Sequence, residues 1–241
     1  LKNAILPQVA EGSLKMALGF AERQSRYNLA DVATTAEASG GGYKLNGMKG
    51  VVFGAPSAGK FVVSARTSGG ARDEDGITLF LVDGDAAGVS VRGYPTADGL
   101  RAGELTLENV EVGADAVVGP VGGGLAILEK TIDQGIAAIA AEATGAMSHL
   151  NDMTLEYIKT REQFGQPIGK FQVLQHRMVD MFIAHEEAKS MSMMAAMRID
   201  EEDAGERKKA LSAAKVQIGK SGRYVGQQAI QLHGCLLYTS D

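Results

Sequence analysis

Residues 160–172 read TREQFGQPIGKFQ, and this stretch decides how the second half of the chain folds. Long runs without proline flank it, whereas Phe164-Gly165-Gln166-Pro167 combines a glycine with a proline and interrupts any helix. We therefore expect a helix over residues 125–160, a tight loop, and a second helix over about 170–200. A third helix is predicted from about 206 to 233, and helices of this length pack as a bundle.

The second of these helices carries one apolar stripe, which predicts the face that it buries. Its members recur every three or four residues: Leu174, Met178, Met181, His185, Ala188, Met191 and Ala195. The six methionines between residues 178 and 197 belong to this helix. We interpret them as helix core or bundle interface rather than as a ligand-binding surface.

The first half of the chain has a different residue pattern, in which glycine-rich turns separate short runs of β-branched residues. These runs predict strands over residues 49–53, 61–66, 77–83, 89–92 and 104–107. Asn46-Gly47 is a hairpin signal, and Gly40-Gly41-Gly42 is interpreted as a turn. Short strands at this spacing predict an antiparallel sandwich or barrel. Because helices do not alternate with the strands, a doubly wound Rossmann sheet is disfavoured.

Composition narrows the class of protein further. The 241 residues are 45% hydrophobic and 22% charged, which is typical of globular domains, and the net charge of −5 argues against nucleic-acid binding. A single cysteine, Cys235, argues against disulfides and a cysteine-based zinc site and favours a cytoplasmic protein. No apolar run is long enough to predict a membrane span. The histidines lack metal-site spacing: His149, His176, His185 and His233.

The loop of residues 160–172 also carries chemistry. Arg161 lies at a helix end, and a guanidinium can grip phosphate oxygens in a bidentate manner. Phe164 offers a flat apolar face on a tight turn, and the start of the next helix favours anions. The alternative interpretation is an ordinary helix–loop–helix in which Arg161 pairs with a carboxylate.

The pattern RxxFGxxIxxFQxxQxxxxDM, from Arg161 to Met181, resembles a signature of the acyl-CoA dehydrogenase family. Three further segments resemble the same family and keep its order: Leu45-Asn46-Gly47-x-Lys49, Asp98-Gly99-x-Arg101 and Gln231-x-x-Gly234. Together the four segments span nearly the whole chain. The resemblance therefore implies a fold for all of it, and not only for the loop.

The implied fold is of the α+β class, with an antiparallel β-sandwich or barrel domain followed by an up-down helical bundle, truncated at both ends. We expect residues 1–17 to be a remnant of an N-terminal helical domain. Residues 18–119 would form the β-domain and residues 120–234 an incomplete C-terminal bundle. The last residues, 235–241 (CLLYTSD), resemble a translated sequencing adapter, so we expect a non-native tail and give Cys235 no role.

The resemblance implies a flavoprotein that oxidises an acyl-CoA thioester with FAD as its cofactor. By matched positions, Arg161 and Phe164 would contact the pyrophosphate and adenosine side of a neighbouring subunit's FAD. Gln172 and Gln231 would hydrogen-bond the same FAD, and Gly234 would let the backbone approach it. Shared sites of this kind imply an oligomer, with a dimer of dimers as the expected form.

The sequence departs from the family pattern where the flavin ring is expected. The family's T-E-P-x-x-G-S-D loop aligns with residues 21–28 (AERQSRYN), which keep only Glu22, a further expected cofactor-binding residue. A position that often holds Trp beside the flavin is Val51 here. These differences concern the side chains next to the reacting ring, so they bear on substrate class and flavin geometry.

The catalytic base is also absent from its alternative place in the family. Some members carry it on the first long helix, at the position of Gly135, which cannot accept a proton. We therefore expect no catalytic residue within this chain and place the base beyond its C-terminal end. Asp133, Glu129 and Glu142 are interpreted as surface or helix-capping carboxylates.

Three functions stay open at this point. Residues 93–101 and 161–177 look most like the small subunit of pimeloyl-CoA-type dehydrogenases, in which two different subunits assemble and the electron-transfer flavoprotein is the expected acceptor. A second possibility is a catalytically silent subunit that completes a neighbour's FAD site. An acyl-CoA oxidase is a third, because oxygen reactivity depends on access to the flavin.

Overall fold

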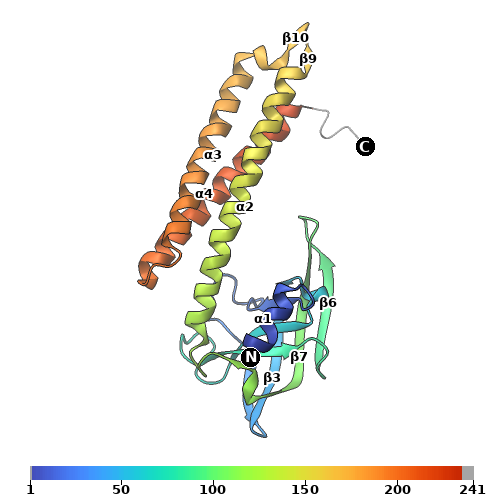
Figure 1. Cartoon of the computed structure of the whole chain (residues 1–241), viewed down its shortest axis with the longest axis vertical. Helices are drawn as coiled ribbons and strands as arrows, with labels where there is room; N and C mark the ends of the chain where they lie inside the picture. The colour runs from blue at the N-terminus through green and yellow to red at the C-terminus, as the bar shows by residue number, and fades with distance from the viewer. Residues whose placement is uncertain (1, 235–241) are drawn as a thin grey trace. The chain divides into compact units, whose positions relative to one another are not determined.

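The computed structural model describes residues 2–234, which form two compact units that divide between Lys130 and Thr131. The expected tail of residues 235–241 lies outside the described residues. Figure 1 shows the strands of the first unit and the long helices of the second. Within residues 2–234, no helix combines the length and the apolar character that crossing a membrane requires.

One eight-stranded sheet forms the first unit, in the order β6-β7-β3-β2-β4-β5-β8 with β1 beside β4. Its strands are β1 Met16–Gly19, β2 Thr35–Ser39, β3 Gly42–Phe53, β4 Lys60–Arg66, β5 Ile77–Asp83, β6 Val89–Pro95, β7 Arg101–Gly113 and β8 Val117–Val118. A helix, α1 Lys2–Ala10, precedes them, and two short 3₁₀ turns interrupt the connections, η1 Ala55–Ser57 and η2 Ala114–Ala116.

The sheet is mixed, which corrects the expectation of an antiparallel sheet at two of its strand pairs. Most neighbouring strands are antiparallel, but β1 runs parallel to β4, and Thr35 of β2 forms a parallel bridge to Arg66 of β4. The β2–β3 hairpin lies between β1 and β4 in the sequence and supplies the long crossover that parallel pairing needs. The predicted strands are present, with β3, β6 and β7 extending further than expected.

The β2–β3 hairpin turns at Gly40 and Gly41, which both have positive φ (58° and 85°). Asn46-Gly47, the predicted hairpin turn, instead lies within β3, where the register with β7 shifts between Leu45 and Gly47. The Asn46 side chain accepts a hydrogen bond from the Asn109 backbone N–H at 2.8 Å. The dipeptide therefore forms a bulge, which glycine tolerates as readily as a turn.

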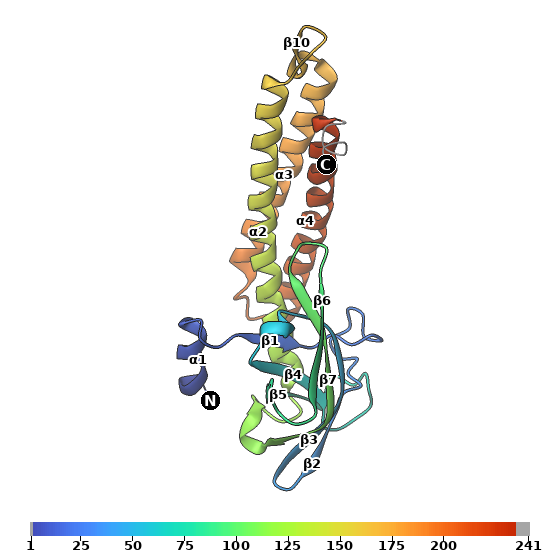
Figure 2. The ribbon, with the colours of Figure 1, turned by 90° about the vertical axis from the view of Figure 1, so that its right-hand side faces the viewer.

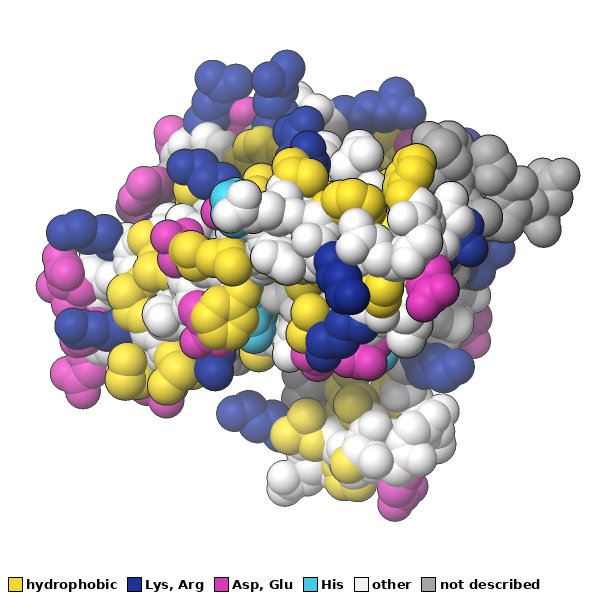
Figure 3. All heavy atoms as spheres, turned by 90° about the horizontal axis from the view of Figure 1, so that it is seen from above, with side chains coloured by type: hydrophobic (Ala, Val, Ile, Leu, Met, Phe, Trp, Pro, Cys, Tyr) yellow, Lys and Arg dark blue, Asp and Glu magenta, His cyan; other side chains and the backbone are white. Residues whose placement is uncertain are grey.

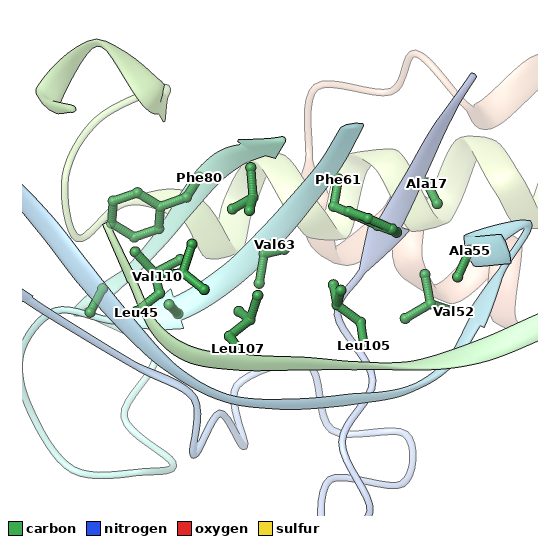
Figure 4. Close-up of a cluster of buried hydrophobic side chains, with 13 residues drawn as sticks. Ala17, Leu45, Val52, Ala55, Phe61, Val63, Phe80, Leu105, Leu107 and Val110 are labelled. Carbon is green, nitrogen blue, oxygen red and sulfur yellow. The ribbon is translucent and has the colours of Figure 1, made fainter. Parts of the chain in front are cut away.

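The sheet bends over on itself around its core. Figure 4 shows Phe61, Val63 and Phe80, from β4 and β5, facing side chains of β3 and β7 across a filled interior. The β3 and β7 side chains are Leu45, Val52, Leu105, Leu107 and Val110, and each is at most 1% exposed. Burial of this apolar surface stabilises the fold and positions the loops at the strand ends.

Three long helices dominate the second unit: α2 Gly124–Thr160, α3 Gln172–Arg198 and α4 Ala204–His233. Each predicted helix is present with its ends moved by a few residues, and Asp203 caps α4 by accepting from the backbone N–H groups of Gly205 and Glu206. Figures 1 and 2 show them running up, down and up. A small hairpin, β9 Glu162–Gln163 and β10 Gln166–Pro167, and a 3₁₀ turn, η3 Ile168–Lys170, join α2 to α3.

The predicted apolar stripe of α3 packs into the bundle. Met181, Ala188 and Ala195, spaced seven residues apart, have no exposure. Other apolar side chains of the unit face outward instead: Ile139, Phe182, Ile183, Met193, Met197 and Val216. Figure 3, which looks onto the end that carries β9 and β10, shows hydrophobic side chains exposed beside charged ones. The methionines of α3 are thus divided between core and surface.

Candidate functional site

The site begins with the two-residue turn of the β9–β10 hairpin. Gln163 pairs with Gln166, and the intervening Phe164 and Gly165 have φ of 58° and 76°, the signature of a type I′ turn. Glycine adopts this region freely, whereas Phe164 is strained there, at a cost on the order of 1 kcal/mol. An aromatic residue in a strained conformation at a loop tip indicates a function other than stability.

Phe164 projects from the hairpin into solvent, with 90% of its surface exposed. Its ring approaches that of Phe171 edge-on, with centroids 6.0 Å apart. The hairpin beneath is held firmly, because the Ile168 N–H donates to the Arg161 carbonyl at 2.8 Å. Gly169 packs so close to α2 that an added Cβ would lie 2.9 Å from the Ile158 carbonyl oxygen. A rigid support therefore presents an exposed aromatic face.

Arg161 lies at the base of this hairpin and is half-buried. Within residues 2–234 its guanidinium has no carboxylate partner, so the alternative of a structural ion pair is not supported. It lines a cavity of about 280 Å³ together with Tyr157, Gln163, Ile168, Leu232, His233 and Gly234. The structure thus brings together Arg161 and Gly234, two of the residues that the sequence assigns to cofactor binding.

The remaining predicted residues of this unit lie at helix ends. Gln172 is the first residue of α3, and Gln231 lies in the last turn of α4; both are exposed. Gly234 follows α4 with φ of 66°, and among residues 2–234, its chain neighbours aside, no heavy atom lies within 4 Å of the place where a Cβ would be. Both amides and the open backbone at Gly234 can therefore meet a ligand.

This group of side chains fits the adenosine diphosphate half of FAD. An unpaired guanidinium suits a diphosphate, an exposed phenyl ring suits an adenine or a ribose face, and amides suit hydroxyl groups. The described residues contain no group of three or more side chains arranged to hold a metal ion. The chemistry of these donors is that of binding an anion, without a nucleophile or a base among them.

Glu22, the predicted cofactor residue of the first unit, is buried and fully occupied by protein donors. Five donate to its carboxylate: Lys49 Nζ at 2.6 Å, Thr34 Oγ1 at 2.7 Å, Gln24 Nε2 at 2.7 Å, and the N–H groups of Ala33 at 2.8 Å and Thr34 at 3.1 Å. Such a carboxylate cannot also face a ligand. Its role in the structure is to hold the segment of residues 21–34 against β3.

The Glu22–Lys49 pair is removed from water, with side-chain exposures of 3% and 0%. Burial alone would raise the pKa of Glu22, but the charge and hydrogen bond of Lys49, with help from Gln24 and Thr34, lower it to about 2. Lys49 also donates to Ser64 Oγ at 3.1 Å. The ion pair therefore links the segment to β3 and β4.

Arg66 supports the far end of the same segment. Its guanidinium donates to four backbone carbonyls, those of Ala30, Ala71, Asp73 and Asp75, at 2.8–3.0 Å. Ala30 belongs to the segment of residues 21–34, whereas the other three belong to the β4–β5 connection. The segment of residues 21–34 lacks the proline and glycine of the family loop, and buried charged side chains hold its shape instead.

Val51, at the position where the family often has Trp, lies in a second bulge of β3. Its φ of 51° is unusual for a β-branched residue, and 52% of its surface is exposed. Phe53, two residues on, is 61% exposed. The last residues of β3 therefore offer two exposed apolar side chains to a ligand, although neither of them is an indole.

Asp133 is not a solvated or capping carboxylate, as the sequence suggested, but part of a buried ion pair. Arg207 Nε lies 2.9 Å from Asp133 Oδ2, and both side chains are 9% exposed. Arg207 also donates to the Glu201 carbonyl at 2.8 Å. Gly135 is exposed on α2. The carboxylate nearest to the alternative base position thus has a structural partner.

Among the cavity residues to which the sequence gave no role are Tyr157 and His233. Tyr157 lies one turn before Arg161 on the same face of α2, and its ring stacks on His233 with centroids 4.3 Å apart. Tyr157 could have been found from the sequence, because a residue four positions before Arg161 lies on the same side of a helix. Its contact with His233 could not, because His233 lies 76 residues further along the chain.

Comparisons with known proteins agree with this arrangement. The family model described as acyl-CoA dehydrogenase, middle domain, matches residues 17–110, and the one described as acyl-CoA dehydrogenase, C-terminal domain, matches residues 122–241. The 3-(aryl)acrylate reductase of Clostridium sporogenes is 32% identical over 250 residues, covering 100% of this chain and 64% of that protein.

Two further proteins show how much of a longer relative this chain represents. The mitochondrial isovaleryl-CoA dehydrogenase of Solanum tuberosum is 32% identical over 202 residues, 83% of this chain and 49% of that protein. A crystal structure of an FAD-dependent dehydrogenase superimposes with a TM-score of 0.91 at 28% identity, covering 98% of this chain and 64% of that one. The chain therefore spans between half and two thirds of these relatives.

Proposed function

Because the chain belongs to the acyl-CoA dehydrogenase family, we propose that the complete protein is an FAD-dependent oxidoreductase that oxidises an acyl-CoA thioester between Cα and Cβ. The observation that carries this proposal is the unpaired Arg161 beneath the exposed, strained Phe164. Both residues stand where the family signature places its cofactor contacts, and their geometry suits an anionic dinucleotide.

FAD, when bound, supplies the acceptor for the hydride that leaves Cβ. Arg161 would neutralise its diphosphate, and Phe164 would cover the adenosine side. Gln172 and Gln231 would donate or accept hydrogen bonds, with Gly234 leaving room for close approach. Since Phe164 faces away from its own bundle, we propose that it serves the FAD of a second subunit, so that the protein works as an oligomer.

In the first unit, the contribution that we propose is the shape of residues 21–34. Glu22 and Arg66 hold this segment from its two ends, so the backbone N–H groups that do not already donate within the protein would be left for the flavin ring, without the hydroxyl side chains of the family loop. We assign removal of the Cα proton to a carboxylate outside residues 2–234, since Asp133 is committed to Arg207.

The finer assignment is a subunit of a pimeloyl-CoA-type dehydrogenase in the cytoplasm, with the electron-transfer flavoprotein as acceptor. Support comes from the stretches 93–101 and 161–177. The relatives named above include a reductase and a dehydrogenase, so they support the family rather than one acyl chain.

A catalytically silent partner subunit is the second candidate. The observations that favour it are the exposed Gly135 at the alternative base position and Val51 at the place of the flavin-side Trp. Such a subunit would lend Arg161 and Phe164 to a neighbour's FAD.

Absorbance spectroscopy tests both candidates. The complete gene product, purified alone and with the product of its neighbouring gene, is expected to show flavin bands that bleach when an acyl-CoA is added without oxygen. Bleaching only in the mixed complex would support the silent partner. Colourless protein in both preparations would overturn the proposed function, and rapid reoxidation in air would indicate an oxidase.

A further inference from the structure

His233 lines the same cavity as Arg161, although its position in the sequence gave it no role. It is the last residue of α4, next to Gly234. The inference drawn below rests on the proposed function, because it concerns how the same site holds the dinucleotide.

The two ring nitrogens of His233 are not equivalent. Nδ1 lies 2.8 Å from the Ala229 carbonyl oxygen. A carbonyl oxygen only accepts, so Nδ1 carries the proton of this hydrogen bond. Nε2 has no hydrogen-bond or ion-pair partner among residues 2–234. The imidazole is thereby held by one nitrogen while the other is left for a ligand.

Tyr157 holds the ring in place. The two rings are stacked, with 26° between their planes, and the Tyr157 hydroxyl donates to the His233 carbonyl oxygen at 3.3 Å. A side chain with a stacked face and a bonded nitrogen has little rotamer freedom left. Its remaining nitrogen can therefore bind a ligand at little further cost in conformational entropy.

The charges around His233 make its protonation depend on the ligand. Besides His233, the titratable or charged groups that line the cavity are Tyr157 of α2 and Arg161, which directly follows α2. The other lining residues are uncharged: Gln163, Ile168, Leu232 and Gly234. The C-terminal end of α4 favours an imidazolium, whereas the guanidinium of Arg161 opposes it. A diphosphate bound between the two cations would remove that opposition.

We propose that His233 is a second binding residue for the diphosphate of FAD, donating from protonated Nε2 to the anion that Arg161 also binds. Binding then takes up a proton. Because the ligand favours the protonated imidazole, the affinity for FAD is expected to be higher in acidic than in basic solution.

The test uses the complete gene product stripped of flavin, with FAD affinity measured by quenching of flavin fluorescence between pH 5.5 and 8.5. We expect FAD to bind about tenfold more tightly at the acidic end, the difference between a charge-assisted and a neutral contact. Riboflavin, which has no diphosphate, should show no such slope. Calorimetry in two buffers of different ionisation enthalpy should show that the protein takes up a proton when it binds FAD but not when it binds riboflavin.

Two variants and one control assign the effect. His233→Gln retains a neutral donor and should remove the slope; His233→Phe preserves the ring against Tyr157 and should also remove it, should the first variant be unstable. His149→Gln changes an exposed histidine of α2 and should keep the slope. Arg161→Gln should weaken FAD binding at every pH.

The outcomes separate the inference from the proposed function. A slope that survives in both His233 variants, or binding without proton uptake, would overturn the role of His233 while the dependence on Arg161 stood. Failure of the unaltered protein to bind FAD at any pH would overturn the proposed function and the inference with it.

Discussion

Lys49 Nζ lies 2.6 Å from Glu22 Oε1 in the interior of the first unit, where neither side chain is more than 3% exposed. Lys49 is also one of the largest side chains with no solvent exposure. A buried cation of this kind is tolerated only with its partner, because the loss of one charge leaves the other without compensation.

Replacing Lys49 with methionine should therefore destabilise the protein by about 3–5 kcal/mol, since the Glu22 carboxylate would stay buried without its cation. Urea unfolding followed by circular dichroism measures the effect. Lys44→Met is the matched control, because Lys44 pairs with Glu111 at 3.8 Å on the surface and should cost less than about 1 kcal/mol. Equal effects of the two substitutions would contradict the assigned role.

Stability should also depend on pH through Glu22. Its folded pKa of about 2 is below the ordinary value of 4.5, so the unfolded chain takes up the proton first as the pH falls. The contribution, on the order of 3 kcal/mol, is complete above about pH 4.5 and is lost as the pH falls towards 2. Glu22→Gln should flatten the stability curve in this window, and Glu37→Gln, at an exposed site, should not.

The Asp133–Arg207 pair allows a test of whether Asp133 stabilises the fold or acts as the catalytic base. Asp133→Asn should lower the free energy of unfolding by several kcal/mol, because it leaves the guanidinium of Arg207 buried without its charge partner. Arg198→Met, which breaks an exposed pair with Glu201, should have little effect. The turnover per folded Asp133→Asn molecule should be unchanged. A variant that is as stable as the unaltered protein but has no turnover would instead identify Asp133 as the base.

Phe164→Asn should change stability and FAD affinity in opposite directions. Asparagine suits the first position of a type I′ turn, so relief of the strain at φ 58° should stabilise the protein by about 0.5–1 kcal/mol. Loss of the exposed ring should weaken FAD binding severalfold. Phe164→Tyr keeps the ring and should retain affinity. A stable variant with undiminished affinity would show that the ring does not contact the cofactor.

The helices were predictable because their apolar residues recur with helical spacing and because Pro167 and Asp203 mark their ends. The hairpin turn at residues 46–47 was predicted wrongly because Asn-Gly fits both a type I′ turn and a bulge. Pairing with the long strand β7 decides between the two, and the local sequence does not show it. Local signals therefore placed the elements but not every turn.

The contacts of the site escaped prediction because they join distant parts of the chain. Glu22 and Lys49 are 27 residues apart, and Asp133 and Arg207 are 74 apart. A resemblance aligned Glu22 with a flavin loop, but only the folded structure shows that five donors occupy its carboxylate. Arg161 and Gly234, by contrast, were both assigned to the cofactor from two separate segments that resemble the family, Arg161–Met181 and Gln231-x-x-Gly234.

Under the proposed function, the complete burial of Lys49 also has a chemical consequence. Acyl-CoA molecules acylate accessible amines without any enzyme, and surface lysines such as Lys44 and Lys170 stand open to this damage. Lys49 can react only when the sheet opens far enough to separate it from Glu22. An acyl group found on Lys49 would therefore identify a molecule whose sheet has opened at least once. An activity measurement cannot make this distinction, because a molecule that has opened and refolded is as active as one that has not.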